Sequence, residues 1–309
     1  MFDSLSAILS LLRPRTYVSA GLDAGGNWSL SFPSHEGIKF NAVVRGSCWV
    51  SVDGHNEIIH LEHGDCFLLT RGRSFYLTAD PSLDPVDSRP IYKAAENGIA
   101  TCNGGGEFFL VGGRFAFSDD YANVLFGALP PIVKVREASN QASVLRWSLD
   151  LLASEVRSRQ PGGILVAEHL AHIMLVQVLR LYLASPTSVG VGWFFALSHP
   201  KIGAAMNAMH SDPARNWTLE QLCHLTGMSR STFAQKFRQL VGTSPIEYLT
   251  RWRMLVASNR LRSSNENVAV IAYSLGYESE SAFSTAFKRM MACSPREYQR
   301  RTLATTSGA

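Results

Sequence analysis

Residues 268–298 read VAVIAYSLGYESESAFSTAFKRMMACSPREY, and this stretch decides how the last third of the chain folds. Apolar residues at helical spacing open it. Gly276 follows where that helix must end, because glycine enters the left-handed backbone region without steric cost. Ser279 is placed to cap a second helix, in which Phe283 and Phe287 share one buried face. The stretch therefore predicts a helix, a tight turn and a second helix with a polar outer face, which is the helix-turn-helix pattern.

The same arrangement occurs about fifty positions earlier. Residues 217–248 read WTLEQLCHLTGMSRSTFAQKFRQLVGTSPIEY. Here Gly227 supplies the turn, Ser229 supplies the cap, and the paired phenylalanines are Phe233 and Phe237. Each copy ends in a Ser-Pro pair followed by a tyrosine. Chance rarely gives two such copies, so the pattern indicates an internal repeat with two helix-turn-helices in one chain.

The repeated unit resembles the AraC/XylS family of bacterial transcription regulators, whose members carry two helix-turn-helices in one chain. The motif GYESESAFSTAFKR, followed by SPREY, is close to the C-terminal signature of that family. The resemblance covers residues 204–302. It implies a sequence-specific DNA-binding regulator whose partner is double-stranded promoter or operator DNA and, if the protein is an activator, RNA polymerase.

The resemblance also implies which side chains meet the DNA. Base contacts are expected from the outward faces of the two reading helices, at Ser231, Ala234, Gln235, Glu280, Ser281 and Thr285. Several of these side chains are short, so DNA shape is expected to carry part of the specificity. Phosphate contacts are expected from Arg230, Arg238, Arg253, Lys288 and Arg289. For each single base-contact residue the alternative is a solvated helix face. The helix of residues 245–261 is expected to hold the two units about one DNA turn, roughly 34 Å, apart.

Charge and cysteine usage fit this interpretation. Residues 204–302 contain 13 lysines and arginines against 7 acidic residues, a net charge of +6, whereas the preceding residues have a net charge of −2. A basic third beside a mildly acidic remainder is typical of a nucleic-acid module joined to a domain that does not bind polyanions.

The five cysteines are scattered and lack CxxC spacing, which favours reduced thiols in a cytoplasmic protein. No signal peptide is predicted, and no membrane span is predicted because Gln177 and Arg180 interrupt the most apolar segment.

The N-terminal region has a different pattern. Seven short β-rich runs between residues 28 and 111, separated by Gly, Asp and Pro, predict an antiparallel barrel or sandwich. Asp53-Gly54 predicts a hairpin, and Gly64-Asp65 predicts a turn before an apolar strand. Residues 43–69 resemble the cupin-like jelly roll that many AraC-type regulators carry at their N-terminus. The resemblance implies a small-molecule effector in the barrel. Candidate lining residues are the strand aromatics Trp28, Phe40 and Trp49, for which an ordinary core role is the alternative.

The predicted fold class is therefore α+β and multidomain, with a cupin-like β-barrel (jelly roll), a helical hairpin and an all-α double helix-turn-helix domain. The expected divisions are an effector domain of residues 1–136, a hairpin of residues 137–184, a linker of residues 185–203, a DNA-binding domain of residues 204–302 and a disordered tail of residues 303–309. The hairpin has more apolar residues than one face needs, which favours a homodimer. Packing on the barrel alone is the alternative.

Two alternative functions stay open at this point. Four N-terminal histidines raise the possibility of a metal-dependent cupin enzyme fused to a DNA-binding tail; they are His35, His55, His60 and His63. The HxH motif of catalytic cupins is absent, and His60 and His63 would point to opposite faces of a strand, so no catalytic residue, metal or cofactor is predicted. The other possibility is a regulator without a ligand, or one controlled by oxidation of Cys48 and Cys66. Redox control requires an exposed thiol of low pKa, whereas a buried thiol is the ordinary expectation.

Overall fold

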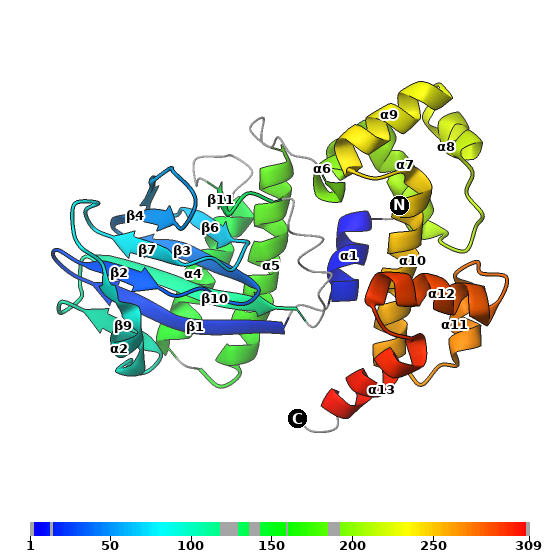
Figure 1. Cartoon of the computed structure of the whole chain (residues 1–309). Helices are drawn as coiled ribbons and strands as arrows, with labels where there is room; N and C mark the ends of the chain where they lie inside the picture. Colours follow the sequence, from blue (N-terminus) through cyan, green and yellow to red (C-terminus); the bar gives the residue numbers. More distant parts are fainter. Residues whose placement is uncertain are drawn as a thin grey trace. The chain divides into compact units, whose positions relative to one another are not determined.

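The structure of the 309-residue chain is a computed structural model. The described residues are 3–12, 15–117, 129–135, 143–158, 160–184 and 192–306. They form two compact units, one of residues 14–188 and the other of residues 1–13 together with 189–309 (Figure 1). We call them the barrel unit and the helical unit.

Two sheets make up most of the barrel unit. One has six strands in the order β11-β6-β3-β10-β1-β9, and the other has five in the order β5-β4-β7-β2-β8. The strands are β1 (Arg15–Ala24), β2 (Ser29–Phe32), β3 (Ile38–Arg45), β4 (Ser47–Val52), β5 (Ile59–Glu62), β6 (Cys66–Leu69), β7 (Phe75–Thr78), β8 (Val86–Asp87), β9 (Ile99–Cys102), β10 (Phe108–Ala116) and β11 (Ile132–Val135). A short helix, α2 (Ser88–Lys93), follows β8. The β-rich N-terminal domain is therefore confirmed.

The predicted local features of the barrel are present. Strands β4 and β5 pair antiparallel, which confirms the hairpin at Asp53-Gly54, although residues 53–58 connect the strands instead of a two-residue turn. Gly64-Asp65 turns the chain into β6. Strands β1, β8, β9 and β11 were not expected. Strand β1 has no clean apolar alternation, and its strand conformation rests on pairing with β10, about ninety residues away in the chain.

Two helices cover the outer face of the six-stranded sheet. They are α4 (Ser143–Ser158) and α5 (Gly163–Ala184), which contact each other, and which contact β3 and β1 respectively (Figure 1). The predicted helical hairpin is thus confirmed, and it packs on the barrel. By length and composition α5 could cross a membrane, but the core helix of a soluble protein passes the same test, and here the buried face of α5 lies on the sheet.

Nine helices are described in the helical unit. They are α1 (Ser4–Leu12), α6 (Trp193–Ser198), α7 (Pro200–Ser211), α8 (Leu219–Thr226), α9 (Arg230–Val241), α10 (Pro245–Ser263), α11 (Val268–Ser274), α12 (Glu280–Met291) and α13 (Pro295–Thr306). Figure 1 shows α10 running between the α8–α9 pair and the α11–α12 pair. Two helix-turn-helices joined by one long helix are therefore confirmed as the architecture of this unit.

Two predicted boundaries are corrected by the structure. The expected linker of residues 185–203 contains α6 and the start of α7, and α6 contacts both α7 and α9. The helix forms in the expected linker because Trp193 and Phe194 are buried, and burial of large aromatic side chains stabilises the folded protein. The expected tail of residues 303–309 is helical as far as Thr306, where α13 ends. Residues 185–191 and 307–309 lie outside the described residues.

The first helix forms as expected but belongs to the helical unit, not to the effector domain in which residues 1–136 were placed. Leu5 and Ile8 are buried, and α1 contacts α7 and α10. Ser4 Oγ lies 2.7 Å from Nδ1 of His210, and the Asn259 amide donates to a backbone carbonyl of α1 at 2.8 Å. The amphipathic pattern of α1 shows that one face must be buried, but it carries no information about which element buries that face.

Candidate nucleic-acid interface and barrel pocket

Helix α9 begins at the predicted cap residue and buries the predicted face. The Ser229 hydroxyl accepts a hydrogen bond from the backbone N–H of Thr232 at 3.3 Å, which satisfies one of the free donors of the first turn. Phe233 and Phe237 are fully buried and fix the inward face. The predicted cap and the predicted buried face are both confirmed, so the opposite side of α9 is left open to solvent.

Helix α12 repeats this construction. The Ser279 hydroxyl accepts from the backbone N–H of Ala282 at 3.1 Å, and Phe283 and Phe287 are fully buried. Residues 231–240 and 281–290 have the same sequence of buried, half-buried and exposed positions, residue for residue. The repeat seen in the sequence is therefore a repeat of two exposed helix faces in one compact unit.

The outward faces hold most of the predicted base-contact residues. Ser231, Gln235, Ser281 and Thr285 are exposed, and Ala234 is half-buried beside them. Ser284 occupies in α12 the position that Ala234 occupies in α9, with the same degree of burial. Ser284 was missed as a candidate, although the fifty-residue offset of the repeat identifies it.

Glu280 is placed differently from the other candidates. Its carboxylate accepts a hydrogen bond from the Arg296 guanidinium at 3.1 Å, so it is already occupied at the start of α12. The matched position in α9 is Arg230, which pairs with Glu220 at 3.0 Å. Both are exposed or partly exposed ion pairs, which are weak in water and can be exchanged for contacts with a ligand.

Apart from Arg230, which pairs with Glu220, the predicted phosphate-contact residues divide into two groups. Arg238, Lys288 and Arg289 are exposed in the second halves of α9 and α12. Arg253 is turned inward: its Nε donates to the carbonyl of Pro213 at 2.7 Å, and its Nη2 donates to the carbonyl of Arg215 at 3.1 Å. Burial lowers the pKa of this guanidinium. The sequence did not predict this arrangement, which does not favour a phosphate contact by Arg253.

Arg253 instead joins the two halves of the DNA-binding region. It lies on α10, binds the loop between α7 and α8, and its guanidinium lies 5.6 Å from the ring centre of Tyr277 in the turn between α11 and α12. Gly276, in the same turn, has a φ of +79°, and a Cβ there would lie 2.1 Å from the carbonyl oxygen of Ala214. The turn of the second helix-turn-helix therefore lies against the backbone of the loop that precedes the first one, and glycine is required at this contact.

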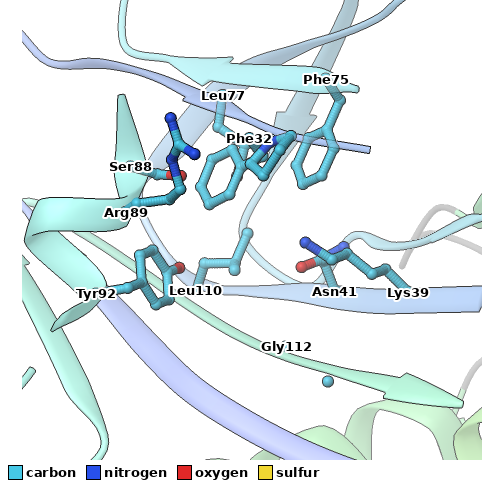
Figure 2. Close-up of a pocket in the computed structure, with 12 residues that line it drawn as sticks. Phe32, Lys39, Asn41, Phe75, Leu77, Ser88, Arg89, Tyr92, Leu110 and Gly112 are labelled. Carbon is cyan, nitrogen blue, oxygen red and sulfur yellow. The ribbon is translucent and has the colours of Figure 1, made fainter. Parts of the chain in front are cut away.

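The barrel unit contains a pocket of about 220 Å³ between its two sheets (Figure 2). Its lining includes the aromatic residues Phe32, Phe75 and Tyr92 and the polar residues Lys39, Asn41, Ser88 and Arg89. The expected candidates Trp28, Phe40 and Trp49 do not line it. Trp28 packs in the core against Phe108, Phe40 packs against Phe115 on the helix-covered side of the sheet, and Trp49 lies against His60. Strand pairing decides which aromatic residues face the pocket, and sequence alone does not show it.

The arrangement of the histidines and cysteines supports neither a metal site nor a reactive thiol among the described residues. Within the described residues no group of three or more His, Cys, Asp or Glu side chains could hold a metal ion. His63 Nδ1 lies 2.7 Å from the Val44 carbonyl, and burial lowers the pKa of His35 to about 4. All five cysteines are buried, and burial raises the pKa of the Cys48 thiol. A thiol with a raised pKa holds little thiolate, which is the reactive form.

Comparison with known proteins agrees with both units. A cupin family matches residues 3–184, and a helix-turn-helix domain family matches residues 222–301. A protein of Streptomyces lividans named as an AraC-like transcription regulator is 45% identical over 298 residues, which are 96% of this chain and 98% of that protein. The regulator AlkR of Acinetobacter baylyi is 30% identical over 96% of this chain and 99% of its own length. Among solved structures, the DNA-binding domain of AdpA in complex with a target DNA is 27% identical, covers 35% of this chain and 96% of that chain, and has a TM-score of 0.33. The chain therefore belongs to the family of AraC-like transcription regulators, with a cupin domain ahead of its helix-turn-helix domain.

Proposed function

We propose that this protein recognises an operator in double-stranded DNA by placing α9 and α12 in successive major grooves, and that a small molecule in the barrel pocket controls this binding. The observation that supports the proposal most is the matched exposure of the two reading helices, position by position, within one compact unit. Two such helix faces, joined by α10, can contact two successive major-groove segments of one duplex.

Base recognition is assigned to the outward set Ser231, Ala234, Gln235, Ser281, Ser284 and Thr285. Gln235 is the longest of these, and its amide can make paired hydrogen bonds to adenine in the major groove. Short side chains at the other positions leave room for close approach of the backbone, so DNA shape contributes to specificity. Arg238, Lys288 and Arg289 are assigned to phosphate contacts, which position the protein without reading sequence.

The test begins with selection of duplexes from a random library by the full-length protein, followed by affinity measurements on the selected site. Gln235→Ala should lose about 1–3 kcal/mol of binding free energy and relax preference at one base pair only. Gln160→Ala, which changes an exposed glutamine of the barrel unit, is the matched control. Equal loss on every sequence would refute a base-reading role for Gln235.

We also assign a homodimer to the outer face of the α4–α5 hairpin. Trp147 of α4 is 58% exposed and Ile173 of α5 is 38% exposed, and exposure of large apolar side chains on both helices supports an association site on this hairpin. Ile173→Glu should shift the protein to monomer in light scattering after size exclusion, whereas Ser154→Glu, at an exposed polar position of α4, should not. A monomeric wild-type protein at micromolar concentration would overturn this assignment.

The remaining assignments follow from the regulatory role. We place the protein in the cytoplasm, with RNA polymerase as a partner where it activates transcription, and we assign no catalysis to the cupin domain. The names of its relatives as transcription regulators support this. No observation on the described residues specifically favours a metal-dependent enzyme or control by cysteine oxidation.

A further inference from the structure

One row of side chains inside the barrel breaks the apolar pattern of its strand. Alternate residues of β3 face the space between the sheets, and this row is Lys39, Asn41 and Val43. The register places them opposite Arg114, Gly112 and Leu110 of β10, respectively. Val43 and Leu110 belong to the apolar core, as such a row requires. Lys39 and Asn41 instead place a charge and an amide where the strand pattern calls for apolar side chains.

Asn41 carries an unused donor in this row. The residue is only 8% exposed, and its Nδ2 atom is buried without a hydrogen-bond partner. An unsatisfied buried amide destabilises the folded protein, and a ligand that accepts a hydrogen bond from it removes that cost. Opposite it, a Cβ on Gly112 would lie 2.5 Å from Asn41 Oδ1, so glycine makes the space for the amide. Glycine inside a strand often marks a place where a ligand or another backbone approaches closely.

Lys39 carries an uncompensated charge beside it. Its ammonium lies 4.9 Å from the ring centre of Phe75, and no carboxylate of the described residues pairs with it. Burial and the neighbouring Arg114 both lower the pKa of Lys39. Its other titratable neighbour, His35, is itself cationic when protonated, and burial and Lys39 lower its pKa to about 4. Lys39 therefore places a partly buried cation at this end of the pocket without a carboxylate from the described residues, which favours an anionic ligand there.

The rest of the pocket is largely apolar. Phe32 and Phe75 stack with their ring centres 4.6 Å apart, and Leu77 and Leu110 complete this wall (Figure 2). The other cation on the lining, Arg89, is already paired with Asp87 at 2.7 Å. A volume of about 220 Å³ lies below the roughly 300–1,000 Å³ of sites for drug-sized ligands. The pocket therefore suits a compact molecule with one anionic end.

We propose that this pocket binds a small organic carboxylate with an apolar body. The carboxylate accepts hydrogen bonds from Lys39 Nζ and Asn41 Nδ2, and the body lies against Phe32, Phe75 and Leu110. Bonds of this kind to an ionised group are about twice as strong as those between neutral groups. A polyol is disfavoured because its hydroxyls would lose water against the apolar wall without gaining partners. The identity of this ligand as the effector rests on the proposed function, whereas its binding does not.

The first experiment is calorimetric titration of the full-length protein with benzoate and hexanoate, each compared with its neutral amide. At least one carboxylate should bind saturably, and its amide should bind at least about tenfold more weakly, which corresponds to about 1.4 kcal/mol. Equal affinity of acid and amide would overturn the proposal. Absence of binding by both carboxylates up to about 10 mM, a range that detects millimolar dissociation constants, would also overturn it.

Two variants separate the charge from the shape. Lys39→Met should weaken carboxylate binding at least about tenfold without lowering the thermal midpoint of the unliganded protein, because it removes a desolvated cation. Asn41→Asp keeps the shape of the side chain and places a negative charge against the ligand, so it should weaken binding equally. Lys93→Met, at an exposed lysine of α2 outside the pocket, is the control. Wild-type affinity in both pocket variants would contradict the assignment.

DNA affinity measured with and without saturating carboxylate distinguishes this inference from the proposed function. If the protein binds its operator but neither carboxylate, the proposed DNA recognition stands and the proposed carboxylate site is refuted. A protein that binds the carboxylate without a change in DNA affinity supports the pocket assignment and overturns control by this ligand.

Discussion

The two turn glycines provide a matched pair that tests how the helix-turn-helices are joined. Gly227 and Gly276 both have left-handed backbone angles, with φ of +59° and +79°. A Cβ at Gly227 would meet no atom within 4 Å, so Gly227→Ala costs only the left-handed strain, about 1–2 kcal/mol. A Cβ at Gly276 would lie 2.1 Å from the carbonyl oxygen of Ala214 and 2.9 Å from Nη2 of Arg253.

The cost at Gly276 is larger for two reasons. A backbone oxygen cannot move away as a flexible side chain does, and overpacking of this kind adds about 1–3 kcal/mol. Displacing the Arg253 guanidinium also weakens its hydrogen bonds to the carbonyls of Pro213 and Arg215, and a hydrogen bond to a charged group contributes about 1.5–3 kcal/mol. We therefore expect Gly276→Ala to be more destabilising than Gly227→Ala by at least about 2 kcal/mol.

Hydrogen exchange of the full-length protein, read by mass spectrometry, is the suitable assay. A chain with two compact units need not unfold in one two-state transition, whereas exchange reports the opening free energy of each segment. A difference of about 2 kcal/mol corresponds to roughly thirtyfold faster exchange of α11 and α12 in Gly276→Ala than of α8 and α9 in Gly227→Ala, each relative to wild type. If Arg253 carries part of the cost, Gly276→Ala should add less than its full effect to Arg253→Met. Equal protection losses in the two glycine variants would refute the close contact between the halves.

Three further predictions concern the helical unit. Arg238→Ala should weaken binding to all DNA sequences and reduce the slope of log affinity against log salt by about 0.9, whereas Lys93→Ala should not; an unchanged slope would count against the phosphate contact. Ile8→Ala should lower the opening free energy of α7 and α10 by about 2–5 kcal/mol in hydrogen exchange, and the exposed Ser10→Ala should leave it within about 0.5 kcal/mol. Burial lowers the pKa of His210 to about 3, below the usual value near 6.5. Between pH 3 and pH 6.5 His210 is therefore protonated in the unfolded chain and neutral in the folded chain. The free energy of unfolding consequently falls as the pH is lowered through this range, by at most about 1.4 kcal/mol per pH unit. His210→Gln should flatten that slope when the opening free energy of α7 is measured by hydrogen exchange at a series of pH values, and an equally steep slope would show that other groups cause it.

The sequence by itself determined the two reading helices. Ser229 and Ser279 as caps, the turn glycines and the paired phenylalanines act within a dozen residues of each other, and the structure has each where it was expected. Local signals of this kind are sufficient because a cap or a left-handed turn is satisfied by its own neighbours in the chain. The seven predicted β-rich runs and the hairpin between β4 and β5 are also present in the structure.

Only the tertiary structure decided which distant segments became neighbours. The docking of α1 on α7 and α10, and the inward turn of Arg253, both depend on contacts between residues far apart in the chain. The pocket depends on them as well, because the register of β3 against β10 sets Lys39 and Asn41 opposite Arg114 and Gly112. Strand alternation shows that these residues share a face, but only the pairing of the sheets shows that this face is interior. Removing the Lys39 charge and the Asn41 amide from water costs free energy unless a partner pairs with them, and the extent of that removal is set by the whole fold.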